Sequence, residues 1–289
     1  MPLMLADNHT DHRQANSKSP EFPRLSYRMP ALFIGHGNPM NAIEDSEFSR
    51  AWAEVGQSIP KPKAILCISA HWETVGTRVT AMERPRTIHD FHGFPKPLFD
   101  TEYPAPGNPA LARLIRETVA DVPIMLDSDW GLDHGAWSVL CRMFPQADIP
   151  VVQLSLDRTK EPAFHYGLGK SLRELRNRGI LIVGSGNIVH NLGAVVWQDT
   201  AHDWALEFDR QIKQLITSGN NDAIIRYDQL GDTAKASVPT AEHFLPLLYI
   251  LGLQETREEV KFFNEKVTLG AISMTSLQVV GDSQCPDNS

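Results

Sequence analysis

The chain contains 289 residues, of which 42% are hydrophobic, and it carries 27 Lys and Arg against 35 Asp and Glu, a formal net charge of −8. This acidic balance argues against a nucleic-acid-binding protein, and no apolar run approaches the about 18 residues that a membrane-spanning helix needs. The 3 cysteines are too widely spaced for a disulfide framework, and the polar N-terminus lacks the apolar core of a secretory signal. We therefore expect a cytoplasmic protein that binds neither nucleic acid nor membranes.

The pattern of apolar residues predicts one α/β domain. Residues 1–28 are polar and lack periodicity, which indicates a loosely ordered N-terminal tail, and residues 282–289 are expected to form a short C-terminal tail. Across residues 29–281, apolar runs of strand length alternate with amphipathic helical patterns, and no linker interrupts them. Such a pattern is typical of a largely parallel or mixed sheet with helices on both faces. The expected strands are 31–34, 64–69, 149–156, 180–184 and 272–280.

Four segments have the apolar spacing of amphipathic helices. One begins with Asn108, a favoured N-cap residue, followed by Pro109 at the first helical position. Gly179 and Gly219 are expected to end two of the others. The expected helical segments lie around 48–55, 108–119, 168–175 and 204–215.

The segment 83–108 is rich in proline and aromatic residues and is longer than an ordinary connection. We interpret it as a functional loop. His89 and His92, which lie within it, are expected to be loop or lid residues rather than metal ligands.

Three of the expected strands lead into a histidine. His36 and His71 follow the first two strands closely, and His190 follows the strand 180–184 after a short polar stretch. In an open parallel sheet, ligands bind beyond the carboxyl ends of the strands, so histidines delivered there would converge. Because neutral imidazole is a good ligand for zinc or iron, the sequence predicts a metal site at this edge of the sheet.

A further ligand is expected from either Glu242 or His243. Thr240 is a candidate N-cap that would place both residues in the first turn of a helix. Neighbouring helical residues point about 100° apart, so only one of the two is expected to face the metal. His243 would complete an all-histidine site, whereas Glu242 would complete a site of two histidines and one carboxylate. The residues alone leave this choice open.

His134 follows Asp133 in a segment that we interpret as a turn, where an imidazole could donate or accept a proton. The remaining histidines are expected to have no role in the site. They are His165 and His202, which we place on helical surfaces, and His9 and His12 in the tail.

Eight short motifs occur in order along the chain. Each alone is weak evidence for a family, but the ordered set is highly specific. They are MPALFIGHGNPMNAIED, ISAHW, TIHDFHGFP, YPAPGNPAL, GLDHGAW, VQLSLD, GSGNIVHNL and PTAEHFLPLLYILG. On these motifs the chain resembles, from about residue 29 to residue 280, the class III extradiol ring-cleaving dioxygenases. The resemblance is to the DOPA 4,5-dioxygenase-like branch, which is related to the catalytic subunit of protocatechuate 4,5-dioxygenase.

The resemblance implies a metal site that holds a single ion. Matched by motif, its residues are His36 of GHG, His71 of SAHW, His190 of NIVHN and His243 of AEHF. In the protocatechuate-type enzymes the equivalent of His190 is an acid–base residue beside the metal, whereas in the DOPA-dioxygenase-like branch all four histidines are associated with zinc. His134 of DHG matches a histidine implicated in proton transfer. The resemblance therefore implies catalytic roles for His134 and His190.

At three positions the chain departs from the residues that are common in the family. Asn38 stands where Ser is common, His92 where Gly is common, and Phe99 where Tyr is frequent. His92 and Phe99 lie in the loop that is expected to cover the substrate, so these two departures bear on which substrate is bound.

The implied activity is the opening of a catechol ring, DOPA-like in structure, by O₂ at one divalent metal ion per chain. Fe(II) is expected for this reaction because zinc has no redox chemistry, and Zn(II) is the alternative bound ion. The same histidines would also serve a zinc-dependent hydrolase or a non-catalytic Memo-like binding or redox scaffold.

Overall fold

The computed structural model describes residues 21–281. Its strands are β1 (Ala31–Gly35), β2 (Ala64–Thr74), β3 (Thr77–Thr80), β4 (Ile124–Asp127), β5 (Val151–Asp157), β6 (Ile180–Gly186), β7 (Glu259–Phe263), β8 (Val267–Thr268), β9 (Ile272–Ser273) and β10 (Ser276–Val280). Its α-helices are α1 (Glu47–Ser58), α2 (Lys96–Phe99), α3 (Pro109–Thr118), α4 (His134–Met143), α5 (Pro162–Ser171), α6 (Arg173–Arg176), α7 (Asp203–Thr217), α8 (Asn221–Ile225), α9 (Asp232–Ser237) and α10 (Leu245–Leu253). Short 3₁₀ turns are η1 (Pro39–Ala42), η2 (Leu192–Ala194) and η3 (Tyr227–Gln229).

The central sheet has 8 strands in the order β4-β3-β5-β2-β6-β1-β10-β7. Strands β5, β2, β6 and β1 are parallel to one another. Strand β10 is antiparallel to β1, and β7 is antiparallel to β10. At the other end of the sheet, β3 is antiparallel to β5 and parallel to β4. The expected mixed, largely parallel sheet is confirmed, and the carboxyl ends of its four central strands meet at one edge.

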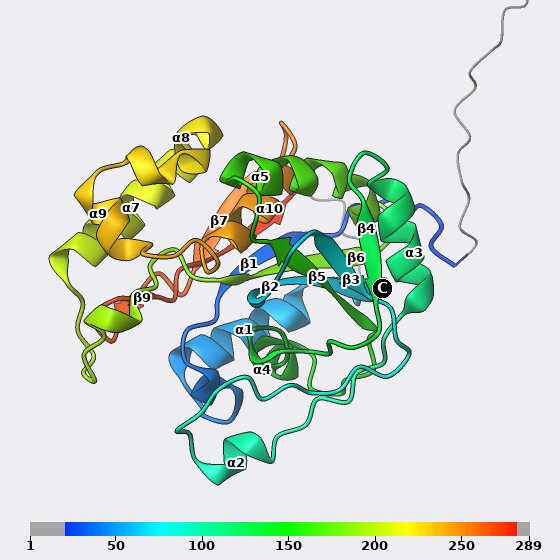
Figure 1. Ribbon diagram of the computed structural model, residues 1–289, viewed down its shortest axis with the longest axis horizontal. Helices are drawn as coiled ribbons and strands as arrows, with labels where there is room; N and C mark the ends of the chain where they lie inside the picture. Colours follow the sequence, from blue (N-terminus) through cyan, green and yellow to red (C-terminus); the bar gives the residue numbers. More distant parts are fainter. Residues whose placement is uncertain (1–20, 282–289) are drawn as a thin grey trace, which may run out of the picture.

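Helices cover both faces of this sheet (Figure 1), with α1 and α4 on one face and α5 and α10 on the other. Side chains along β1 alternate between the two faces, as the twofold period of a strand requires. Phe33 belongs to the apolar cluster that includes Leu247 of α10. Leu32 belongs to the cluster that includes Trp52 of α1 and Trp137 of α4. Burial on both faces accounts for the continuous apolar runs in the sequence.

Several predicted elements have different bounds in the structure. Asn108 caps α3 as predicted, since its side chain accepts a hydrogen bond from the Leu111 backbone N–H at 2.8 Å. The helical pattern 168–175 is divided between α5 and α6, which meet at Leu172. The run 272–280 is likewise divided, because β9 pairs with β8 in a separate small sheet and only β10 joins the central one.

Residues 21–28, which we expected in a loosely ordered tail, contact the domain. Phe22 is buried in the core, and the Leu25 backbone N–H donates to the Asn177 carbonyl at 2.7 Å. His9, His12 and the C-terminal segment 282–289 lie outside the described residues. Within residues 21–281, none of the helices combines the length and apolar character that crossing a membrane requires.

Candidate metal centre

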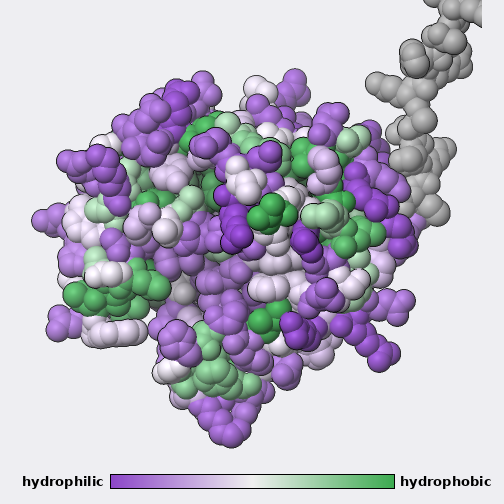
Figure 2. Space-filling view, in the orientation of Figure 1, coloured by the Kyte–Doolittle hydropathy of each residue, from purple (hydrophilic) through white to green (hydrophobic). Residues whose placement is uncertain are grey.

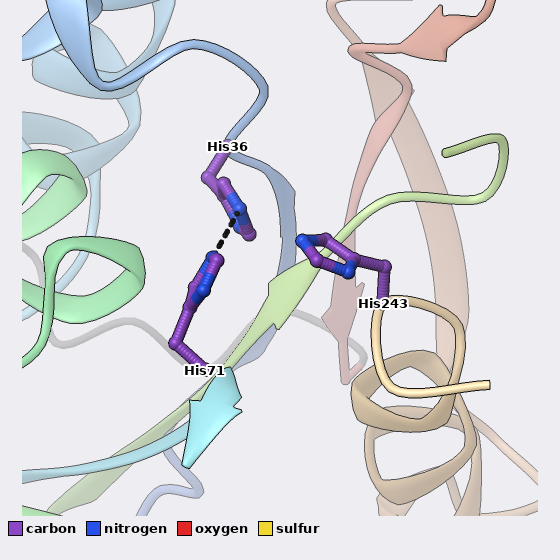
Figure 3. A group of neighbouring side chains, drawn as sticks. All are labelled: His36, His71 and His243. Atoms are coloured by element: carbon purple, nitrogen blue, oxygen red, sulfur yellow. Dashed lines mark hydrogen bonds between the residues drawn. The ribbon is translucent and has the colours of Figure 1, made fainter. Parts of the chain in front are cut away.

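Three imidazoles meet at the carboxyl edge of the sheet (Figure 3). His36 directly follows β1, His71 lies near the end of β2, and His243 lies in the turn that precedes α10. One ring nitrogen from each of the three lies within 4.8 Å of those of the other two. His36 Nε2 and His71 Nε2 are 3.1 Å apart. Segments separated by more than 200 residues therefore form one compact cluster of nitrogen ligands.

His71 does not follow the end of its strand, as we expected, but lies within it. Strand β2 continues to Thr74, and its pairing with β5 shifts register between Ile68 and Glu73. Such an irregularity bends a strand and re-aims its side chains, which accounts for a functional side chain inside a strand. At His36 the chain turns immediately, because Gly37 adopts a φ of 58°, a conformation that glycine adopts without strain.

The predicted helix start at Thr240 is wrong. Helix α10 begins at Leu245 with Phe244 at the N-cap position, and Pro246 lies in its first turn, where proline is favoured. The Thr240 hydroxyl donates to the Glu242 carboxylate at 2.8 Å instead of capping a helix. His243 and Glu242 therefore lie in a turn and not on a helical face.

Hydrogen bonds at Nδ1 leave Nε2 of two imidazoles with a lone pair. The Ser185 hydroxyl donates to the Gly135 carbonyl at 2.6 Å, so its oxygen is free to accept from His36 Nδ1 at 3.0 Å. The Glu242 carboxylate accepts from His243 Nδ1 at 3.2 Å. Acceptors that hold the second ring nitrogen of a ligating histidine fix its tautomer and orientation in known metal sites.

The same tautomers make the cluster incomplete without a cation. His243 Nε2 is buried and has no hydrogen-bond partner among the described residues. With metal–nitrogen bonds of about 2.0–2.1 Å, two imidazole nitrogens on one ion lie about 3.0–3.4 Å apart, which the 3.1 Å between His36 and His71 matches. The residues present thus fit a divalent metal ion.

Burial keeps these imidazoles neutral, as metal ligands must be. It holds the pKa of His36 and that of His243 well below the usual value, and neighbouring imidazoles lower both further. Burial, followed by the nearby His134 imidazole, lowers the pKa of His71 to about 3. At neutral pH all three side chains therefore offer lone pairs and not positive charge.

His190 lies against this cluster from the side. Its ring stacks on that of His243 with 3.4 Å between centroids and 5° between planes. Its backbone N–H donates to the Ser237 carbonyl at 2.9 Å, and burial lowers its pKa to about 4. His190, Glu242 and His243 form a second group of close potential ligands, so His190 lies beside the group of His36, His71 and His243 and not within it.

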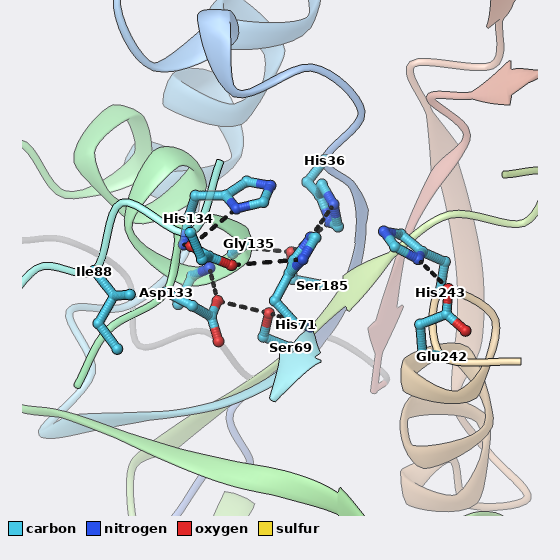
Figure 4. A network of polar contacts seen from close by, with 12 residues as sticks. His36, Ser69, His71, Ile88, Asp133, His134, Gly135, Ser185, Glu242 and His243 are labelled. Atoms are coloured by element: carbon cyan, nitrogen blue, oxygen red, sulfur yellow. Dashed lines mark hydrogen bonds and ion pairs between the residues drawn. The ribbon is translucent and has the colours of Figure 1, made fainter. Parts of the chain in front are cut away.

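His134 lies on the side of His71 that faces away from His243 (Figure 4), and it pairs there with Asp90. His134 is the first residue of α4 and not part of a turn, because Asp133 caps that helix by accepting from the Ala136 N–H. Asp90 Oδ1 accepts from the His134 backbone N–H at 2.9 Å and lies 3.0 Å from its Nδ1. Asp90 Oδ2 lies 3.6 Å from His71 Nδ1. One carboxylate thus faces both imidazoles.

Asp90 is the functional candidate that the sequence analysis missed. Burial raises its pKa, but the hydrogen bond and charge of His134 outweigh this effect, so the pKa lies below the usual value. The sequence feature that could have indicated Asp90 is its position between His89 and His92, in the motif TIHDFHGFP of the loop 83–108.

Of the histidines outside the site, His165 is not on the helical surface where we expected it. It is fully buried, and its Nδ1 lies 3.1 Å from the Tyr249 hydroxyl, because α5 packs directly on α10. His202 directly precedes α7, and its Nε2 donates to the Ala194 carbonyl at 2.9 Å. His89 Nε2 donates to the Thr101 carbonyl at 2.9 Å within the loop, whereas His92 lines the cavity described next.

A cavity of about 560 Å³ opens beside the histidines. Residues 90–94 of the loop 83–108 form one wall, and the segment that follows β6 forms another. The lining residues are His36, Gly37, Asn38, Pro39, His71, Asp90, Phe91, His92, Gly93, Phe94, His134, His190, Leu192, Val195, Trp197, His243, Leu269 and Ile272.

Comparisons with known proteins agree with this architecture. The chain is 48% identical over 261 residues to a protein of Escherichia coli strain K12 named 4,5-DOPA dioxygenase extradiol, covering 88% of this chain and 96% of that protein. It is 38% identical over 253 residues to the protein of the same name from Beta vulgaris, covering 85% and 94% respectively. The crystal structure of an uncharacterized protein from Escherichia coli K12 superposes with a TM-score of 0.77 at 43% identity, covering 88% of this chain and 100% of that one.

The family model that matches spans almost the whole described chain, residues 30–280. Its members are metal-dependent enzymes, and the histidine cluster at the edge of the sheet is a candidate metal site. On this match and on the relatives above, the chain belongs to the family of the catalytic LigB subunit of aromatic ring-opening dioxygenase, an extradiol ring-cleaving enzyme family.

Proposed function

We propose that this enzyme opens the ring of a DOPA-like catechol with O₂ at one divalent metal ion. The observation that carries the proposal is the convergence of three neutral imidazoles, with Nε2 of His243 unpartnered, at the end of a 560 Å³ cavity. The names of the relatives from Escherichia coli and Beta vulgaris support DOPA as the model substrate. The wide spacing of the cysteines supports a cytoplasmic location.

His36, His71 and His243 are the proposed ligands. The sequence left open whether Glu242 or His243 faces the metal. We propose His243, because its ring points to the other two histidines, while Glu242 accepts a hydrogen bond from its Nδ1. Fe(II) bound there would supply the redox chemistry that O₂ requires, whereas Zn(II) would fit the same nitrogen ligands without supplying it.

His190 is proposed to act as a base and not as a fourth ligand. It lines the cavity and stacks on His243, and its lowered pKa keeps it neutral and able to accept a proton from a catechol hydroxyl. A catechol held as its anion is the form that a metal ion binds best. General base catalysis of this kind typically contributes about 10²–10⁴-fold.

His134 is proposed to hold and deliver a proton at Nε2. Its Nδ1 faces the Asp90 carboxylate at 3.0 Å, which orients the ring. Because the same carboxylate oxygen also accepts from the His134 backbone N–H, the imidazole and the carboxylate are fixed relative to each other. Asp90 is thus a positioning residue for the proposed acid.

Reconstitution with Fe(II) under anaerobic conditions, followed by addition of a catechol and O₂, tests this proposal. The wild-type protein is expected to consume O₂ and form a yellow ring-opened product. His71→Ala removes a ligand from the middle of the cluster and is expected to abolish metal binding and turnover. His89→Gln is the matched control, because it also removes an imidazole but retains an N–H that can donate to the Thr101 carbonyl. A metal-free His71→Ala protein with full activity would overturn the assignment.

A further inference from the structure

The cavity has two chemically different ends. The clustered histidines and Asp90 line one end, and Leu192 and Trp197, which are largely exposed, mark an apolar end toward solvent in the segment between β6 and α7. A volume of about 560 Å³ belongs to the class that takes drug-sized ligands. A single catechol ring at the histidines therefore leaves room for a substituent at the apolar end.

Two side chains at this apolar end are unusually exposed. Trp197 is 80% exposed and Leu192 is 70% exposed, the highest values among the large exposed hydrophobic residues of the described chain. Apolar surface gathers beside β9 in the space-filling view (Figure 2). Exposed apolar side chains at the rim of a cavity are a common mark of a binding surface, and the ring of a tryptophan offers a large contact area to an apolar ligand.

The side chains that line the cavity supply no permanent positive charge. No Lys or Arg lines it within residues 21–281, and the one carboxylate on its wall, Asp90, belongs to the histidine end. Two lysines close in sequence to lining residues are already paired. Lys96 lies 2.5 Å from Asp100, and Lys266 lies within 3.0 Å of both Glu47 and Asp199. His92 is the one lining side chain outside the histidine cluster that can become cationic.

We infer, building on the proposed function, that this cavity selects catechols whose ring substituent has no net charge, with Trp197 and Leu192 contacting that substituent. An apolar or zwitterionic side chain fits, whereas a side chain that carries only a carboxylate would lose water without gaining a cationic partner. Its charge would also lie in the same cavity as the Asp90 carboxylate. The charge of the ring substituent is thus discriminated by the lining side chains that lie outside the proposed metal site.

The test uses 3-(3,4-dihydroxyphenyl)propionate and its methyl ester, which share the same catechol ring and differ in the charge of the side chain. Dissociation constants are measured anaerobically on the zinc-loaded protein, and kcat/KM is measured on the Fe(II) protein. The ester is expected to bind about tenfold more tightly than the acid or better, and its kcat/KM is expected to be higher by a similar factor. DOPA, as a zwitterion, is expected to lie near the ester.

Side-chain truncation tests the two residues. Trp197→Ala is expected to weaken binding of the ester about three- to tenfold and Leu192→Ala to weaken it less, while unsubstituted catechol is little affected. Leu206→Ala is the matched control, since Leu206 is an exposed leucine on α7 that does not line the cavity.

Equal affinity for acid and ester would overturn the inference, as would a preference for the acid that disappears in His92→Ala. Unchanged ester binding in both Trp197→Ala and Leu192→Ala would overturn the assignment of these residues. If the Fe(II) protein opens catechol itself but does not discriminate by charge, the inference alone fails. If it opens no catechol, the proposed function fails with it.

Discussion

The close packing of β6 against the His243 turn makes Gly186 a sensitive position for metal binding. A Cβ atom at Gly186 would lie 2.1 Å from the His243 carbonyl oxygen and 3.2 Å from Pro246 Cγ. The same turn is tied to the end of β6 by a 2.8 Å hydrogen bond from the Asn187 N–H to the His243 carbonyl. Backbone atoms cannot rotate away as a side chain can, so Gly186→Ala must shift the segment that carries His243 by about 1 Å.

The expected effect falls on metal affinity more than on folding. Overpacking of this kind costs about 1–3 kcal/mol of the free energy of unfolding, which leaves most domains folded. A displacement of about 1 Å at a functional group costs about 10²-fold in activity. Disturbing the groups that orient a metal ligand typically costs about 10–100-fold in affinity. We therefore expect Gly186→Ala to fold but to hold its metal at least tenfold more weakly.

Metal affinity can be measured by competition with a chromophoric chelator, and folding by thermal unfolding followed by circular dichroism. Gly167→Ala in α5 is the matched control, because a Cβ there has no heavy atom within 4 Å. It is expected to bind metal like the wild type and to gain about 0.5–1 kcal/mol from the higher helix propensity of alanine. Wild-type metal affinity in Gly186→Ala would refute the reasoning.

Three further predictions concern titratable side chains. Asp90→Asn is expected to lower kcat about 10²-fold at saturating metal without reducing the metal content, because the amide removes the carboxylate charge that faces and orients the His134 ring. Steady-state kinetics and metal analysis check this, and loss of the metal ion would contradict it. Glu258→Gln disrupts a buried ion pair with Arg176, whose Nη2 lies 2.6 Å from the Glu258 Oε1. It is expected to lower the free energy of unfolding, measured in urea, by about 3–5 kcal/mol, and a loss below about 1 kcal/mol would contradict this. Burial lowers the pKa of His165 to about 4 from about 6.5 in the unfolded chain. The unfolded chain thus binds more protons between these values, so His165 should contribute about 2 kcal/mol to the loss of stability from pH 8 to pH 5, beside the contributions of the site histidines. The fall in stability should be smaller by this amount in His165→Gln, and an unchanged pH dependence would exclude the residue as a source.

The convergence of histidines was predictable because it depends on a rule of topology. His36 and His190 follow strands that lie side by side as β1 and β6, and parallel strands end at the same edge of a sheet. Apolar periodicity indicated those strands without knowledge of their order. The predicted bounds of the strands were less accurate where pairing in the sheet overrides local preference. Strand β2, for example, continues past Ser69 because β5 still provides a partner for Glu73 and Thr74.

The environment of the cluster was not predictable in the same way. Asp90 lies 44 residues before His134 in a loop without periodicity, so no spacing in the sequence links the carboxylate to the imidazole. The buried position of His165 was missed for a similar reason, since it depends on α10 packing over α5, and Tyr249 is 84 residues away.

The sequence by itself therefore determined the α/β class and the delivery of histidines to one edge of the sheet, because both follow from local apolar patterns and the direction of parallel strands. Only the tertiary structure decided that the His243 ring, and not the Glu242 carboxylate, points toward His36 and His71. That choice depends on a turn held by Asn187 and on a helix start displaced to Leu245, and these contacts exist only once β6 and α10 are packed together.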